Sequence, residues 1–395
     1  MDSIKNYYPF QAMRPGIQEA FDVLDANEDK KFIFIRGRTG VGKSGISVAL
    51  SRKWNGHILT ATKLLQDQYT STKEFDIEFA LKGKSNYRCC IANSAMADAP
   101  CASRSLLSIG KRKYDIAEKI TTPAQLKDDC VAKQQCEYYE KRSYVKTAGG
   151  GFLNYDFALS NKLGGDSIIL DEAHNFIDKM LDFYSLEISR KKLKSMINVD
   201  DVPNQTNYCA WLDRVKKLAS LKAEVASDTK TREQITNIKE KCASILEEQP
   251  LPGDYFVDIE ADKIVIKPLK PKLIVNKFFK KFNKIFFLSA TMDESFPQIL
   301  GINPKEMVFL SIDGGFPPEY RPVYFPKDIP NINYQTKIVE DLPNIKVLNA
   351  VLAAHNGQKG IIHTGNYRIF TALQSIYGLD ERFTWVEQGA DKGAI

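Results

Sequence analysis

A glycine-rich run that ends in lysine and serine is the first segment whose residue types and spacing could do chemistry. It reads Gly37-Arg38-Thr39-Gly40-Val41-Gly42-Lys43-Ser44 and fits the pattern G-x-x-x-x-G-K-[ST]. Glycines let backbone N–H groups wrap phosphate oxygens, the Lys43 ammonium can reach the β- and γ-phosphates, and the Ser44 hydroxyl can complete a Mg²⁺ shell. The alternative is a chance glycine-rich turn. The apolar run 32–35 before the segment favours a nucleotide site that begins at the end of a strand.

A second segment is acidic and offers the carboxylates that such a site needs. Asp171-Glu172-Ala173-His174 follows the apolar run 167–170 directly. Asp171 could hold Mg²⁺ through its water shell, and Glu172 could orient and deprotonate an attacking water. An acidic first helical turn is the alternative interpretation of four such residues in isolation. Together with Lys43, they predict hydrolysis of a nucleoside triphosphate.

These segments must be positioned by a framework of alternating strands and helices. Short apolar runs at 32–35, 57–60, 167–170 and 285–288 are each followed by polar or glycine-rich residues. This alternation predicts an α/β fold with a parallel sheet, and it places the chemistry at the carboxyl ends of the strands. Two segments interrupt the pattern, residues 82–146 and 178–276. In the second, apolar residues recur at helical spacing around Cys209 and Cys242, which predicts two amphipathic helices with both thiols in their packed faces.

The acidic box resembles that of superfamily 2 helicases, and Ser289-Ala290-Thr291 after the run 285–288 resembles their third motif. The order of the segments is similar to the XPD/DinG family of iron-sulfur DNA helicases. This resemblance implies a P-loop RecA-like domain, an iron-sulfur insertion, a helical arch insertion and a second RecA-like domain. It also implies that His174, Ser289 and Thr291 couple hydrolysis to movement on nucleic acid.

Two further segments resemble motifs of the same family. One contains Arg14 and Gln18 ahead of the glycine-rich run, and its glutamine amide would read the adenine edge. The other contains Thr62 and Gln66, whose side chains would touch the phosphate backbone of one DNA strand.

Five of the seven cysteines lie between residues 89 and 136. Their spacing matches no zinc ribbon built of paired C-x-x-C hooks, although zinc in the same site and unrelated thiols stay open as alternatives. By resemblance, Cys89, Cys101, Cys130 and Cys136 ligate a 4Fe-4S cluster. Cys90 adjoins Cys89, and the sequence does not decide between these two.

The resemblance predicts how the chain is divided. The first motor domain is expected at 1–85, 147–177 and 277–325, where the last part includes the junction. The cluster insertion is expected at 86–146, the arch at 178–276 and a second motor domain at 326–395. A Gln-x-x-Gly-Arg-x-x-Arg segment, which would supply arginines to the γ-phosphate, is missing from the sequence. We therefore expect the second motor domain to be incomplete.

Composition limits the class of protein without choosing the partner. A net charge of +6 permits nucleic acid without demanding it, and no apolar run approaches the length of a membrane span. We expect a monomeric cytoplasmic ATPase of a bacterial or phage-infected cell that moves 5′ to 3′ on single-stranded or forked DNA, with Mg²⁺ and a 4Fe-4S cluster as cofactors. Two alternatives stay open: an RNA-directed DEAH-type ATPase, and a nucleic-acid-binding fragment without motor activity.

Overall fold

The computed structural model divides the chain into two compact units, Met1–Gly315 and Phe316–Ile395. It describes residues 2–77, 80–92, 94–96, 99–102, 123–133, 135–147, 150–161, 163–226, 229–247, 249–251, 253–313, 327 and 329–385. None of the helices in these ranges is both long and apolar enough to span a membrane.

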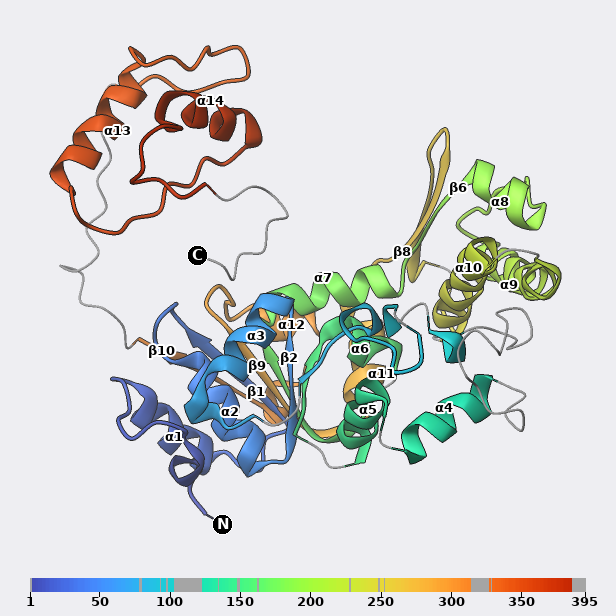
Figure 1. The fold of residues 1–395 in the computed structure, drawn as a ribbon. Helices are drawn as coiled ribbons and strands as arrows, with labels where there is room; N and C mark the ends of the chain where they lie inside the picture. Colours follow the sequence, from blue (N-terminus) through green and yellow to red (C-terminus); the bar gives the residue numbers. More distant parts are fainter. Residues whose placement is uncertain are drawn as a thin grey trace. The chain divides into compact units, whose positions relative to one another are not determined.

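A seven-stranded sheet is the framework of the first unit (Figure 1). Its order is β10-β1-β9-β5-β2-β4-β3, and every neighbouring pair is parallel. The strands are β1 (Phe32–Gly37), β2 (Gly56–Thr60), β3 (Ala80–Leu81), β4 (Phe152–Asn154), β5 (Gly165–Asp171), β9 (Phe282–Ser289) and β10 (Met307–Ile312). The predicted α/β fold with a parallel sheet is therefore confirmed.

Both faces of the sheet are buried under helices, which explains the continuous apolar runs of its strands. Successive residues alternate between two cores: Phe34 and Phe287 belong to one, and Ile35 and Phe286 to the other. The first core also contains residues of α6 (Tyr155–Ser160), α7 (His174–Phe183), α11 (Pro271–Phe279) and α12 (Phe296–Ile299). The second contains residues of α1 (Ile17–Ala26), α2 (Lys43–Lys53) and α3 (Lys63–Ser71).

The first interruption of the sheet pattern contributes α4 (Pro123–Ala132) and α5 (Glu137–Thr147). Both helices supply residues to the same core as α6 and α7, among them Leu126 and Val145. Cysteine side chains also belong to this core, and they are described with the site below.

The second interruption has a hydrophobic core of its own. The two predicted amphipathic helices are α9 (Tyr208–Val225) and α10 (Thr229–Glu247), and both Cys209 and Cys242 pack in this core. An antiparallel sheet of order β6-β8-β7 and helix α8 (Arg190–Ile197) complete it. Its strands are β6 (Leu186–Ser189), β7 (Tyr255–Ile259) and β8 (Lys263–Pro268). The predicted end of the arch at residue 276 falls inside α11, whose Ile274 and Phe278 pack with the large parallel sheet instead.

The second unit contains α13 (Pro343–Ala354) and α14 (Tyr367–Tyr377). Asn366 caps α14, because its side chain accepts a hydrogen bond from Ile369 N at 3.0 Å. The junction predicted to end at residue 325 includes residues 314–325, which lie outside the described residues.

Candidate nucleotide site and cysteine cavity

The glycine-rich run forms the loop between β1, which lies next to the edge strand β10 in the parallel sheet, and α2. Gly40 and Gly42 have φ angles of 87° and 105°, a region that residues with a Cβ rarely adopt. The Lys43 side chain is buried, and its Nζ donates to Gly37 O at 3.0 Å inside the loop. Of the remaining predicted residues, Val41 is buried, Ser44 is half-buried at the start of α2, and Arg38 and Thr39 are exposed.

Of the two predicted carboxylates, Asp171 is the last residue of β5 and Glu172 follows it; β5 lies two strands away from β1 in the sheet. Asp171 is 3% exposed, so burial raises the pKa of its carboxyl, while a hydrogen bond from Tyr69 acts in the opposite direction. The Lys43 ammonium is also near enough to lower this pKa. Glu172 has a φ of 54°, an uncommon value for a residue with a long side chain. The parallel sheet therefore brings Lys43, Asp171 and Glu172 to one edge.

The Ser289-Ala290-Thr291 segment joins this edge from β9, the strand between β1 and β5. His174 Nδ1 lies 2.9 Å from Ser289 Oγ and 3.4 Å from Glu172 Oε2. Thr291 N donates to Ser289 Oγ at 3.2 Å. Hydrogen bonds thus join the three predicted coupling residues, and the His174 imidazole lies beside the Glu172 carboxylate.

The segment that contains Tyr8, Arg14 and Gln18 precedes the glycine-rich loop in the sequence and contacts the loop and α2. Arg14 Nη1 donates to Gly40 O. A Cβ at Gly45 in α2 would lie 2.9 Å from Tyr8 Cε2, so glycine permits this close contact. Gln18, the predicted adenine reader, is half-buried, and its Nε2 lies 3.4 Å from both carboxylate oxygens of Asp22. An adenine would have to compete with that contact.

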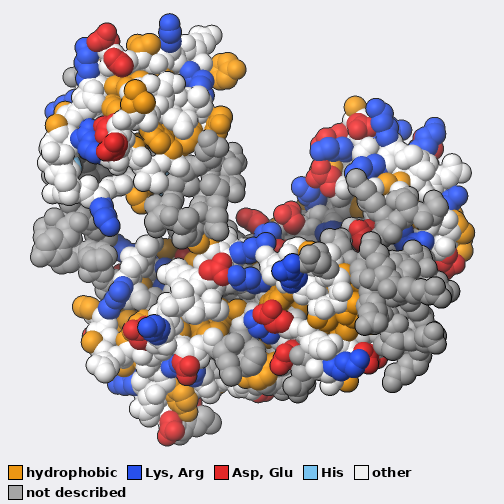
Figure 2. Space-filling view, in the orientation of Figure 1, with side chains coloured by type: hydrophobic (Ala, Val, Ile, Leu, Met, Phe, Trp, Pro, Cys, Tyr) orange, Lys and Arg blue, Asp and Glu red, His pale blue; other side chains and the backbone are white. Residues whose placement is uncertain are grey.

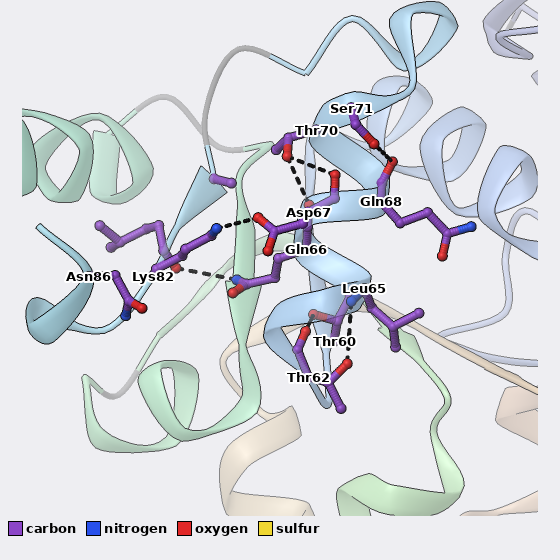
Figure 3. Close-up of polar contacts among 12 residues, drawn as sticks. Thr60, Thr62, Leu65, Gln66, Asp67, Gln68, Thr70, Ser71, Lys82 and Asn86 are labelled. Atoms are coloured by element: carbon purple, nitrogen blue, oxygen red, sulfur yellow. Dashed lines mark hydrogen bonds and ion pairs between the residues drawn. The ribbon is translucent and has the colours of Figure 1, made fainter. Parts of the chain in front are cut away.

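The two predicted DNA-contact residues occupy different environments on α3 (Figure 3). Thr62 is exposed and caps the helix, since its Oγ1 accepts from Leu65 N at 3.3 Å. Gln66 is fully buried, and its Nε2 donates to Leu81 O at 3.3 Å in β3. The structure does not support a DNA contact by Gln66, because helical spacing turns this side chain toward the sheet. On the same helix, Asp67 forms an ion pair with Lys82 just after β3.

The five clustered thiols line one small cavity. Around it lie Cys89, Cys90, Cys101, Cys130 and Cys136, with Met96 and Tyr139 among their neighbours. Burial first, and then the nearby Cys89 and Cys136 thiols, raise the pKa of Cys101 to about 11. Burial and the Cys90 thiol raise the pKa of Cys130 to about 12. The cavity favours neutral thiols until a bound cation compensates the charge.

Cys89 and Cys90 differ in their surroundings. Cys89 is buried, and Ala92 N donates to its Sγ at 3.4 Å, whereas Cys90 is exposed. Among the described residues, no group of three or more His, Cys, Asp or Glu is placed to hold a metal ion.

Two buried tyrosines at the nucleotide site were missed by the sequence analysis. Tyr69 Oη donates to Asp171 Oδ2 at 2.7 Å, and Tyr155 Oη donates to the backbone oxygen of Asp171. The available signal for Tyr69 was its place three residues after Gln66, on the same buried face of α3. No comparable signal pointed to its hydroxyl partner.

Known families and structures resemble parts of this arrangement. Residues 69–193 match the DEAD_2 family model. A solved structure titled "XPD_Helicase" is 17% identical, with a TM-score of 0.51 over 93% of this chain and 75% of that chain. "Truncated XPD" is 18% identical, with a TM-score of 0.43 over 74% of this chain and 98% of that one. "Structure of S. tokodaii Xpd4" is 12% identical, with a TM-score of 0.40 over 91% and 72%. No curated protein matches the chain. At 17% identity, the match to "XPD_Helicase" shows that this chain and that structure share a fold.

Proposed function

We propose that this chain, an XPD/DinG-like superfamily 2 helicase-type ATPase, uses ATP hydrolysis to move 5′ to 3′ along single-stranded DNA. The observation that carries the proposal is the convergence of the phosphate-binding loop, Asp171, Glu172 and Ser289 at one edge of the parallel sheet. Loop N–H groups and the Lys43 ammonium suit the phosphates of ATP. The Glu172 carboxylate suits a water that attacks the γ-phosphate, because a carboxylate both orients the water and accepts its proton.

Ser44 and Asp171 are the residues that would hold Mg²⁺, which neutralises phosphate charge when it is bound. Asp171 offers a buried carboxylate next to the loop. Ser44 and Ser47, one turn apart on α2, both lie next to the buried Tyr69 hydroxyl, which also contacts Asp171.

Movement requires that hydrolysis be sensed outside the nucleotide site. The hydrogen bonds among His174, Ser289 and Thr291 support such a link, since a shift of β9 would displace the imidazole that lies beside the Glu172 carboxylate. On the face shown in Figure 2, basic and acidic side chains are intermixed over the described residues. DNA binding is therefore attributed to local contacts such as Thr62 rather than to the overall charge.

The decisive experiment is Glu172→Gln in the full chain, with Glu306→Gln as the matched control. Glu306 is exposed and lies just before β10, at the amino ends of the parallel strands and therefore away from the candidate site. We expect Glu172→Gln to keep binding a fluorescent ATP analogue but to lose at least about 100-fold in turnover, whereas the control keeps both. Retained turnover would remove Glu172 from the role of base.

The same assay separates the nucleic-acid partners. The proposal expects single-stranded DNA to stimulate turnover more than RNA of the same sequence. Stronger stimulation by RNA would favour an RNA-directed DEAH-type ATPase, because that discrimination requires contacts to the 2′-OH. DNA binding without any turnover would favour a binding fragment.

We further propose that the cysteine cavity holds a 4Fe-4S cluster, ligated by Cys89, Cys101, Cys130 and Cys136. Thiols that surround a cavity suit a cluster better than zinc, whose four ligands must all lie about 2.3 Å from one ion. The buried Cys89 with its N–H···S contact is a better ligand than the exposed Cys90. The cluster would cross-link the insertion that contains it.

Iron and acid-labile sulfide content of protein purified without oxygen tests this proposal. We expect about four of each per chain, lost in Cys89→Ser and Cys101→Ser and retained in the matched control Cys90→Ser. Zinc, or loss of iron in Cys90→Ser alone, would contradict the assignment.

A further inference from the structure

Tyr69 is a fully buried residue that joins the polar helix α3 to the nucleotide site. Its ring centroid lies 4.4 Å from that of Phe152 in β4 and 5.4 Å from that of Phe75, so the ring is held on two sides. Because the ring is held in this way, the hydroxyl can move little unless α3 or β4 moves with it.

The Tyr69 hydroxyl fixes the orientation of the Asp171 carboxylate. It donates to Asp171 Oδ2 at 2.7 Å, while the second oxygen, Oδ1, accepts from Glu172 N at 3.1 Å. One side-chain donor and one backbone donor thus hold the two oxygens. Tyr155 is different, because its hydroxyl reaches the backbone oxygen of Asp171 and leaves the carboxylate untouched.

The same helix carries the exposed N-cap Thr62 at its start, about two turns before Tyr69. A nine-residue helix with its hydrogen bonds intact moves approximately as a rigid body. A force applied at Thr62 therefore reaches the Tyr69 hydroxyl.

We propose that Tyr69 is a positioning residue that orients the Asp171 carboxylate toward Mg²⁺ and makes this orientation depend on the position of helix α3. The inference rests on the proposed function, since it assumes that Asp171 holds Mg²⁺. It adds a connection from α3, whose N-cap Thr62 is the proposed DNA contact, to the proposed metal site. This connection is separate from the contacts among Glu172, His174 and Ser289.

The test is Tyr69→Phe in the full chain, with Tyr155→Phe as the matched control. Both changes remove one hydroxyl from a buried tyrosine that contacts Asp171. The readout is binding of a fluorescent ADP analogue, measured in EDTA and across a Mg²⁺ titration. We expect Tyr69→Phe to need about tenfold more Mg²⁺ for its half-maximal effect, with unchanged affinity in EDTA. Tyr155→Phe should match the wild type, and Tyr69→Phe should add nothing in an Asp171→Asn background.

An unchanged Mg²⁺ requirement in Tyr69→Phe, or an equal shift in Tyr155→Phe, would overturn the inference. If Tyr69→Phe does not fold, Phe152→Leu tests the same point, because it keeps the hydroxyl and frees the ring. That variant should need more Mg²⁺ than the wild type, and an unchanged requirement would again overturn the inference. Failure of the proposed function is distinguishable, since it would appear as a wild-type chain that binds Mg²⁺ and nucleotide but does not hydrolyse ATP. A wild-type chain with no Mg²⁺-dependent binding would overturn both.

Discussion

Acidification to pH 5 should destabilise the folded chain through one histidine. His57 lies in β2 inside the parallel sheet and is 3% exposed. Its Nδ1 accepts a hydrogen bond from Gly151 N at 3.2 Å, so the folded imidazole is neutral and carries its proton on Nε2. Burial lowers the pKa of His57 from 6.5 to about 4.

The size of the effect follows from proton linkage. Between about pH 6.5 and 4 the unfolded chain binds a proton at this residue and the folded chain does not. The free energy of unfolding therefore falls as the pH falls through this window. The loss from pH 7.5 to pH 5 is about 2 kcal/mol, and it approaches about 3 kcal/mol below pH 4.

Urea unfolding of the wild type and His57→Asn at pH 7.5 and pH 5 measures this contribution. The Asn amide oxygen can replace Nδ1 as the acceptor for Gly151 N but has no proton equilibrium in this range. The remaining histidines, His174, His355 and His363, are exposed and are present in both proteins, so the comparison isolates His57. We expect the wild type to lose about 2 kcal/mol more than the variant. An equal loss in both would refute the assignment of the pH dependence to His57.

Two other substitutions test how neighbouring segments are attached. Gly45→Ala should gain about 1 kcal/mol of helix propensity, but its Cβ would lie 2.9 Å from Tyr8 Cε2, and overpacking costs about 1–3 kcal/mol. We expect a small net loss in thermal stability and weaker nucleotide binding, and a clear gain in stability would contradict this. Lys241 Nζ in α10 donates to the last carbonyls of α7, those of Asp182 and Phe183, at 2.7 Å each. Lys241→Met should cost about 1–2 kcal/mol and speed amide exchange in the last turn of α7, whereas unchanged exchange would show that this contact does not hold α10 to α7.

The main strands of the sheet could be predicted because each has a strong local signal. The runs 32–35, 57–60, 167–170 and 285–288 lie inside β1, β2, β5 and β9. A strand buried on both faces is mostly apolar, and this composition is visible without knowledge of its partners. The edge strand β3 lacks that signal, because Ala80 and Leu81 make only a two-residue strand. The edge strand β10 carries the apolar run Met307 to Leu310, which the sequence analysis did not include among its strands.

The second interruption was predicted only in part, for a related reason. Helices α9 and α10 are long enough for a periodic pattern to be recognised, whereas β6, β7 and β8 have four to six residues each. Alternation over such a length does not define a strand unless its partner is known. The same limit applies to residues 359–364, which include the short apolar pair Ile361-Ile362. In the described part of the second unit they pair with no strand, and Ile361 is 82% exposed.

The candidate site shows which contacts a sequence can determine. The phosphate-binding loop, the acidic box and the Ser-Ala-Thr segment each follow a strand of one parallel sheet, so their meeting at one edge is a consequence of topology. The hydroxyl of Tyr69 and the carboxylate of Asp171 are 102 residues apart, and no pattern requires them to meet. Their contact depends on how α3 lies across the sheet, which is set by the ring contacts with Phe75 and Phe152. Groups that perform the chemistry can therefore be located from motifs, whereas groups that orient them become visible only in the packed structure.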